Sequence, residues 1–153
     1  MISVQALKTE LLQQMHAILD SKIKDAKDAI TSAKESRNND TKSSAGDKYE
    51  TGRAMMQMEI DNNELQYSKA MLQKQELLKF NASKSGTNAE NGSIVKTNFE
   101  NYFLSIAMGK MLAFGETYYA ISLASPLGAF LKNKKAGDSG IFQGREFVIE
   151  KIN

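Results

Sequence analysis

The stretch NASKSGTNAENG, residues 81–92, separates two halves of the chain that follow different apolar patterns. Its Gly, Asn and Ser content is typical of a linker. Before it, residues 1–80 contain no Pro and only two glycines, Gly46 and Gly52. After it, short apolar runs alternate with Gly and Asn. We therefore expect a helical part at residues 1–80, a linker at residues 81–92 and a C-terminal domain at residues 93–153.

The helical part carries apolar residues at the spacing of a helix that packs against one partner helix. The first row comprises Leu12, Met15, Leu19, Ile23, Ala26, Ile30 and Ala33. The second row has seven-residue steps at Met58, Leu65 and Leu72, with Tyr49, Met56, Ile60, Tyr67 and Met71 nearby. These two rows predict two helices that pack side by side.

The polar segment SRNNDTKSSAG, residues 36–46, lies between the two rows and does not favour a continuous helix. We expect it to form the tip, about residues 37–47, of an antiparallel two-helix coiled coil. Two interpretations of so long a hairpin stay open. It could be a solvated dimerisation coiled coil, or a rod that carries its tip residues into a narrow, remote site.

The C-terminal part has the alternation of β-strands. The expected strands are residues 93–97, 101–107, 110–114, 117–122, 140–143 and 145–152. Gly115-Glu116 and Gln143-Gly144 are the expected hairpin turns. One helix interrupts the strands, with Ser125 as N-cap and Pro126 in its first turn. The predicted class is α+β: the helical hairpin, then a small antiparallel sheet wrapped on one short helix.

Composition excludes several kinds of protein. The 153 residues include no Cys, so a disulfide framework, a thiolate zinc site and a cysteine nucleophile are excluded. The first half has 12 basic and 12 acidic residues and the second half 8 and 6, and this balance does not predict duplex DNA binding by itself. No apolar run has the length of a membrane helix, and residues 1–12 lack the order of a signal peptide. We expect a cytoplasmic protein without a membrane partner.

The C-terminal residues resemble a known family. The matching residues are Ser125-Pro126-Leu127-Gly128, Leu131, Lys134-Lys135-Ala136-Gly137-Asp138 and Phe147-Val148-Ile149-Glu150. They look like the C-terminal signature of the bacterial Gre (GreA/GreB-like) transcription elongation factors. In that family the signature lies in an FKBP-like domain that follows an antiparallel coiled coil, so both halves match in order and size. The resemblance covers essentially the whole chain, most strongly residues 92–152.

The resemblance implies bacterial RNA polymerase as the partner. We expect a monomer, because the two helices of the hairpin can cover each other's apolar rows. The FKBP-like domain of the family docks near the rim of the polymerase secondary channel, and the coiled coil reaches toward the active centre. The implied docking signature is Ser125, Pro126, Leu127, Gly128, Lys134, Lys135, Gly137 and Asp138. The protein would be no enzyme itself, since the tip carboxylates of the family help hold a catalytic Mg²⁺ of the polymerase for RNA cleavage. No cofactor beyond that Mg²⁺ is implied.

The tip departs from the family pattern. The family has an Asp and a Glu seven and four residues before a Tyr, and alignment of that Tyr with Tyr49 puts Lys42 and Ala45 there. A two-residue slip would bring in Asp40 but pair it with Ser43. We expect the tip residues Lys42, Ser43, Ser44 and Ala45 to lack a metal-chelating pair. The favoured reading is therefore a polymerase regulator without the acidic tip.

Three further hypotheses stay open. The protein could stimulate transcript cleavage through Asp40, Asp47 or Glu50, although acids in the first turn of a helix commonly serve as caps. The cations near the tip could contact the nascent RNA 3′ end or the polymerase: Arg37, Lys42, Lys48 and Arg53. An FKBP-like prolyl isomerase or chaperone would need an aromatic-lined pocket, whereas these aromatics are expected in the core: Tyr102, Phe103, Phe114, Tyr118, Tyr119 and Phe130.

Overall fold

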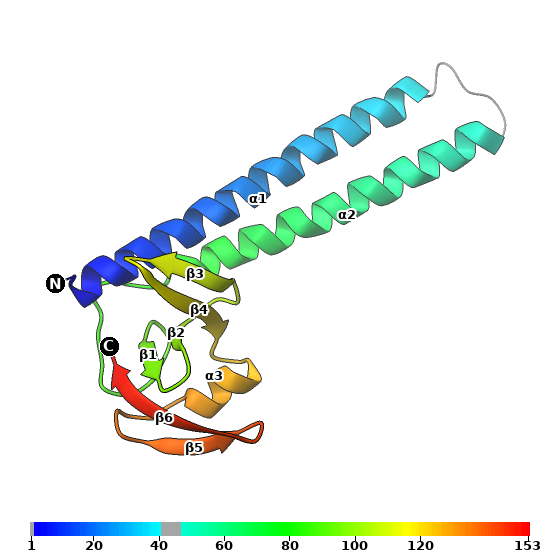
Figure 1. Ribbon diagram of the computed structural model, residues 1–153. Helices are drawn as coiled ribbons and strands as arrows, with labels where there is room; N and C mark the ends of the chain where they lie inside the picture. Colours follow the sequence, from blue (N-terminus) through cyan, green and yellow to red (C-terminus); the bar gives the residue numbers. More distant parts are fainter. Residues whose placement is uncertain (1, 41–46) are drawn as a thin grey trace. The chain divides into compact units, whose positions relative to one another are not determined.

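The computed structural model describes residues 2–40 and 47–153, in which two long helices precede six strands and one short helix (Figure 1). In chain order these elements are α1 (Val4–Asp40), α2 (Asp47–Leu77), β1 (Ile94–Thr97), β2 (Asn101–Ser105), β3 (Gly109–Ala113), β4 (Glu116–Ser122), α3 (Pro126–Leu131), β5 (Ser139–Phe142) and β6 (Arg145–Ile152). A helical hairpin ahead of a mostly antiparallel sheet confirms the predicted α+β class. Within the described ranges, no helix is long and apolar enough to cross a membrane.

The apolar row predicted for the first helix is confirmed. Met15, Leu19, Ala26 and Ala33 are buried. Ile23 and Ile30 are half-buried beside them, and near the start of the row Leu11 is more deeply buried than Leu12. Steps of three and four residues keep these side chains on one face of α1.

The row predicted for the second helix is wrong in its seven-residue steps, since Met58, Leu65 and Leu72 are 68%, 64% and 66% exposed. Four of the residues expected near those steps do lie on the buried side: Ile60 is 1% exposed, and Met56, Tyr67 and Met71 are half-buried. Ala70 and Leu77, at 3% and 1% exposure, complete the buried face, and the row did not include them. Two residues along a helix turn the side chain by about 200°, so the row from Met58 and the row from Ile60 face opposite ways. The face of α2 that includes Ile60 is the buried one because it carries more apolar side chains than the face that includes Met58.

Polar contacts across the hairpin fix the register of α1 against α2. Lys74 pairs with Asp20, and near the other end Arg37 Nη1 donates to Gln57 Oε1 at 2.8 Å. From Asp20 to Arg37 the chain advances 17 residues along α1, and from Lys74 to Gln57 it goes back 17 residues along α2. Equal steps in opposite directions mean that the two antiparallel helices keep one register between these pairs. Exposed ion pairs contribute little energy individually, so the buried row supplies the stability of the hairpin.

The sheet consists of three local hairpins side by side. Its strand order is β3-β4-β2-β1-β6-β5. The pairs β1–β2, β3–β4 and β5–β6 are antiparallel, and so is the join between β1 and β6. The join between β2 and β4 is parallel, with Asn101 opposite Tyr118 and Ser105 opposite Ser122. The predicted antiparallel sheet is therefore correct except at this pair, where the chain crosses over before β3.

One of the two predicted hairpin turns is confirmed. Gln143 and Gly144 have φ of 51° and 76°, the pair of positive angles that a type I′ turn requires. The other turn is Phe114-Gly115 rather than Gly115-Glu116, with φ of 50° and 81°. Glu116 already belongs to β4, opposite Ala113. The strand register thus places a Phe at positive φ, which such a side chain rarely adopts.

The core of the sheet brings together residues from the strands, from α3 and from the expected linker. Its buried members are Ala89, Val95, Tyr102, Leu104, Leu131, Phe147 and Ile149. Ala89 comes from residues 81–92, and its N–H donates to the Lys134 carbonyl at 2.8 Å. Its own carbonyl accepts from the Asn133 N–H at 2.8 Å. This part of the expected linker is therefore packed against the segment that follows α3.

Contacts divide the chain into two compact units. One comprises Met1–Met15 and Glu76–Asn153, and the other is His16–Gln75. The first turns of α1 thus group with the sheet, and the rest of the helical hairpin forms a unit by itself. The domain boundaries at residues 80 and 92 stay a prediction, because contacts do not show which pieces fold alone.

Paired substitutions in α2 test which row stabilises the hairpin. We expect Ile60→Ala to lower the free energy of unfolding by about 2–4 kcal/mol, because it empties buried space. Leu65→Ala removes as large a side chain from an exposed position and should stay within about 0.5 kcal/mol of the parent. Urea unfolding followed by circular dichroism measures both. An equal loss of free energy of unfolding in the two variants would contradict the burial of the Ile60 face of α2.

Candidate functional site

The two ends of the long helices flank the predicted tip. α1 ends at Asp40, and α2 begins at Asp47. Glu50 follows in the first turn of α2 and is exposed. The tip positions Lys42, Ser43, Ser44 and Ala45 lie outside the described residues. Asp47 and Glu50 thus lie in the first turn of α2, where a carboxylate compensates the helix dipole, whereas Asp40 ends α1, where a carboxylate does not.

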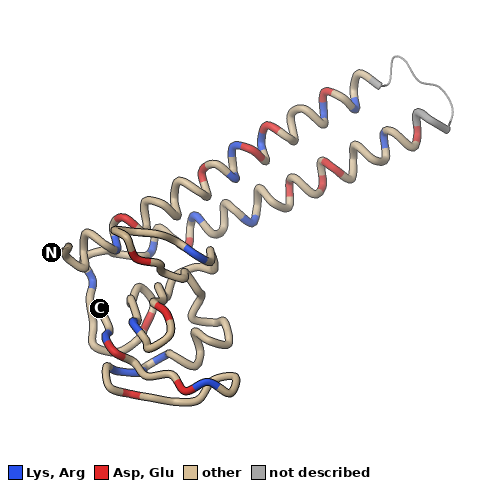
Figure 2. The backbone as a smooth tube through the Cα atoms, viewed as in Figure 1, with Lys and Arg blue, Asp and Glu red and all other residues tan. Residues whose placement is uncertain are grey.

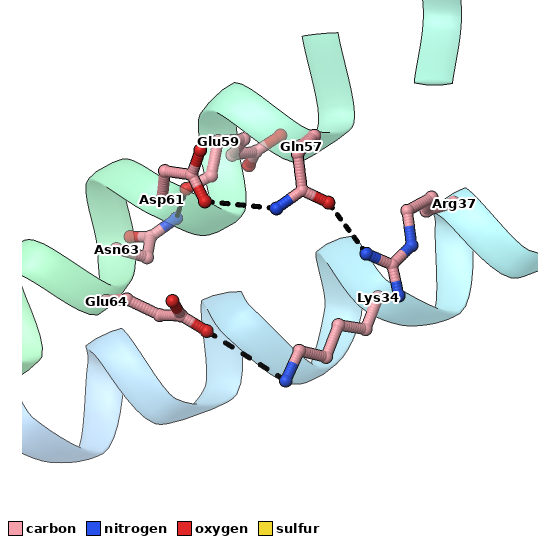
Figure 3. A network of polar contacts seen from close by, with 7 residues as sticks. All are labelled: Lys34, Arg37, Gln57, Glu59, Asp61, Asn63 and Glu64. Carbon is pink, nitrogen blue, oxygen red and sulfur yellow. Dashed lines mark hydrogen bonds and ion pairs between the residues drawn. The ribbon is translucent and has the colours of Figure 1, made fainter. Parts of the chain in front are cut away.

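A polar network ties the described end of the hairpin together (Figure 3). Half-buried Arg37 donates to Gln57, and Gln57 Nε2 donates in turn to Asp61 Oδ1 at 3.0 Å. Lys34 Nζ lies 4.0 Å from Glu64 Oε1. Arg37, a predicted contact for RNA or polymerase, is therefore held by the neighbouring helix in this structure.

Of the predicted cations, Lys42 and the side chain of Lys48 lie outside the described residues. Lys48 lies in the first turn of α2, and Arg53 is exposed one turn further on. Both helices carry basic and acidic residues along their length (Figure 2), so the described part of the hairpin has mixed charge. Among the described residues, no group of three or more His, Asp or Glu is placed to hold a metal ion.

Ser125 and Pro126 start α3. The Ser125 Oγ accepts from the Gly128 N–H at 3.1 Å and donates to the Ser122 carbonyl at 2.7 Å. Pro126 takes the first helical position, where a missing N–H costs nothing. The cap therefore fixes the start of α3 directly to the end of β4.

Gly128 permits the close packing of α3 on β4. A Cβ at this position would lie 2.1 Å from the Ser122 carbonyl oxygen and 2.9 Å from Leu123 Cα. Both neighbours are backbone atoms, which cannot rotate away as a side chain can. Glycine is required here for space, and Leu127 then packs against the core while Leu131 enters it.

Gly137 and Asp138 shape the turn between α3 and β5. Gly137 has a φ of 93°, and its N–H donates to the Ile149 carbonyl at 2.8 Å. The Ile149 N–H returns a bond to the Asp138 carbonyl at 2.8 Å. Asp138 Oδ2 accepts from the Lys135 N–H at 2.8 Å. The Lys-Ala-Gly-Asp run of the signature is therefore explained locally as a turn bound to β6.

The signature lysines differ in their surroundings. Lys134 Nζ lies 4.3 Å from the centre of the Phe130 ring, close enough for a cation–π contact. Lys135 is exposed, as are Pro126 and Lys132. A partner can reach these exposed side chains, whereas Ser125, Gly128, Gly137 and Asp138 hold the backbone of the segment.

The predicted core aromatics lie mostly where expected. Tyr102, Phe103 and Tyr118 are buried, and Tyr119 and Phe130 are half-buried against the core. Phe114 is 53% exposed in the β3–β4 turn, so its expected place in the core is wrong. The turn position at positive φ directs it away from the sheet core.

Sequence reasoning missed Lys8. Its side chain is 2% exposed, and its Nζ donates to the Lys84 carbonyl at 2.8 Å. A signal was present, because Lys8 stands three residues before Leu11 and seven before Met15, on the buried face of α1. Because lysine side chains are rarely fully buried, the sequence alone favours a solvent-exposed position for Lys8.

Comparisons with known proteins give little further information. Neither the protein-family models nor the curated proteins compared with the chain give a match. A solved structure described as "Structure of the transcription factor Gfh1" is similar, with 20% identity over 90% of this chain and 92% of that chain. Its TM-score is 0.34, so this likeness carries no argument about function.

Substitution of two glycines tests the packing of α3. We expect Gly128→Ala to lower the free energy of unfolding by about 1–3 kcal/mol, because the new methyl group meets backbone atoms. Gly86→Ala is the matched control, since its Cβ would lie 3.2 Å from the mobile Glu90 Oε1. Thermal unfolding measures both variants. A Gly128→Ala protein as stable as Gly86→Ala would refute the steric explanation.

Proposed function

We propose that this protein is a Gre-type transcription elongation regulator that binds bacterial RNA polymerase at its secondary channel. The proposal rests on the resemblance of residues 92–152 and on the order of the chain, a long helical hairpin followed by the sheet that carries the signature. The exposed signature side chains Pro126 and Lys135 are the proposed docking contacts.

One feature of the sequence favours a regulator over a cleavage factor. The two positions that carry Asp and Glu in the family are Lys42 and Ala45 here. Mg²⁺ is bound through carboxylate and phosphate oxygens, and an ammonium near the site repels it. A tip of this composition can occupy the channel without completing a two-metal site. We therefore propose that the hairpin regulates access to the active centre rather than stimulating cleavage.

The alternatives receive less support. Residues 41–46 separate Asp40 from Asp47 in the chain, and Glu50 lies within α2. Prolyl isomerisation needs an apolar, aromatic-lined pocket, and the cavity of about 620 Å³ beside α2 has Phe80 as its one aromatic lining residue. Neither activity has a specific structural observation in its favour.

Binding to purified bacterial RNA polymerase tests the proposed partner. We expect the full chain to be retained on immobilised polymerase, and Lys135→Glu to weaken retention severalfold by reversing an exposed charge in the docking segment. Lys151→Glu makes the same charge change on an exposed lysine of β6 and should bind as the parent does. A folded protein that is not retained at all would exclude the proposal.

A cleavage assay tests the role of the tip. Stalled, backtracked complexes with Mg²⁺ should give no shortened RNA with the parent protein. The double variant Lys42→Asp, Ala45→Glu should gain cleavage, because it restores the carboxylate pair of the family pattern.

The control variant Ser43→Asp, Ser44→Glu adds two carboxylates at neighbouring positions while it keeps Lys42, and it should remain inactive. Shortened RNA with the parent protein would instead support the cleavage hypothesis. Asp40→Asn, Asp47→Asn and Glu50→Gln would then identify the acid responsible.

A further inference from the structure

The unit formed by residues 1–15 and 76–153 contains a cavity of about 620 Å³ that is open to solvent. Lys8 of α1, the chain after α2, the ends of β2 and β4, and Lys132 after α3 line it. This volume falls in the range of small-molecule sites, which is roughly 300–1,000 Å³. The cavity is thus large enough for an organic ligand of modest size.

Basic residues dominate the charged lining of the cavity. Four lysines line it, Lys8, Lys79, Lys84 and Lys132, against two acids, Glu76 and Glu90. Six further polar side chains line the cavity: Asn81, Ser85, Asn91, Ser93, Ser105 and Ser122. The cavity therefore carries a net positive charge and polar groups that suit an oxyanion.

Lys8 is the deepest of these charges. A lysine ammonium has three N–H donors, and the Lys84 carbonyl takes one of them. Across the described ranges, Lys8 makes no ion pair and no second hydrogen bond. Burial lowers the pKa of Lys8, the Glu90 charge raises it and the nearby Lys84 charge lowers it further. A buried ammonium with unused donors is unfavourable until an anion or water completes its partners.

Part of the cavity lining is apolar. Phe80 and Leu123 are half-buried lining residues, and Ala124 lies beside them. An inorganic ion would leave this part uncovered, whereas an organic group would remove it from water. We infer that the cavity binds a small organic phosphate, with its phosphate at Lys8 and its apolar part along Phe80 and Leu123.

Ligand binding here would bear directly on the 125–138 segment. Ser122, which accepts the hydrogen bond of Ser125 and packs on Gly128, also lines the cavity. Lys132 follows the last residue of α3. The inference uses only these contacts and does not depend on the proposed function.

A titration of the full chain at constant ionic strength tests this inference. Phenyl phosphate and inorganic phosphate are the probes, followed by amide chemical shifts. We expect saturable shifts at the cavity amides, such as those of Lys84, Ser85 and Gly92, and tighter binding of phenyl phosphate than of inorganic phosphate. Lys8→Met keeps the apolar stem and should weaken phenyl phosphate binding about tenfold or more, because it removes a charged donor.

Matched variants distinguish binding in the cavity from nonspecific attraction of phosphate to surface lysines. Lys151→Met makes the same charge change on exposed β6 and should leave the affinity unchanged. Lys132→Met changes an exposed cavity lysine and should weaken binding, which keeps the test decisive if Lys8→Met fails to fold. Equal effects of Lys132→Met and Lys151→Met, or shifts scattered over surface lysines, would overturn the inference. So would cavity shifts with an oligothymidylate but none with phenyl phosphate.

Discussion

Gly128 packs beneath the end of β4 at a distance that leaves no room for one more carbon, since a Cβ would lie 2.1 Å from the Ser122 carbonyl. This close approach places α3, and α3 places Leu131 in the core with Phe147. The same strand end forms part of the cavity wall, and Lys132 lines the cavity directly after α3. The sheet core, the 125–138 segment and the cavity therefore all depend on one backbone contact that glycine alone permits.

The buried face of a helix was predictable from the sequence where the helix carries a single apolar row. The row of α1 through Leu19 and Ala26 predicted its buried face correctly. In α2 the regular row through Leu65 competed with a less regular row through Ile60, and the repeat alone pointed to the exposed face. The parallel β2–β4 pair was not predictable either, because alternation shows which face of a strand is buried and says nothing about its neighbour.

The two candidate sites also differ in how far the sequence predicts them. The signature from Ser125 to Asp138 was recognisable because its capping and turn residues are chemically distinctive, and the structure gives each of Ser125, Gly128, Gly137 and Asp138 a backbone role. Because these residues shape the backbone, a resemblance that rests on them predicts the local fold of the segment. It predicts the binding partner of the protein less directly. Lys8 could not be recognised as a lining residue, because the cavity wall joins segments far apart in the chain.

The strand order also bears on how the sheet assembles. Each of the hairpins β1–β2, β3–β4 and β5–β6 joins strands that are neighbours in sequence, so each can form early at a small loss of chain entropy. The joins β2–β4 and β1–β6 close longer loops, and the second links the first strand to the last. Folding of this half should therefore be limited by the docking of preformed hairpins, and its slowest event should be the arrival of β6 beside β1.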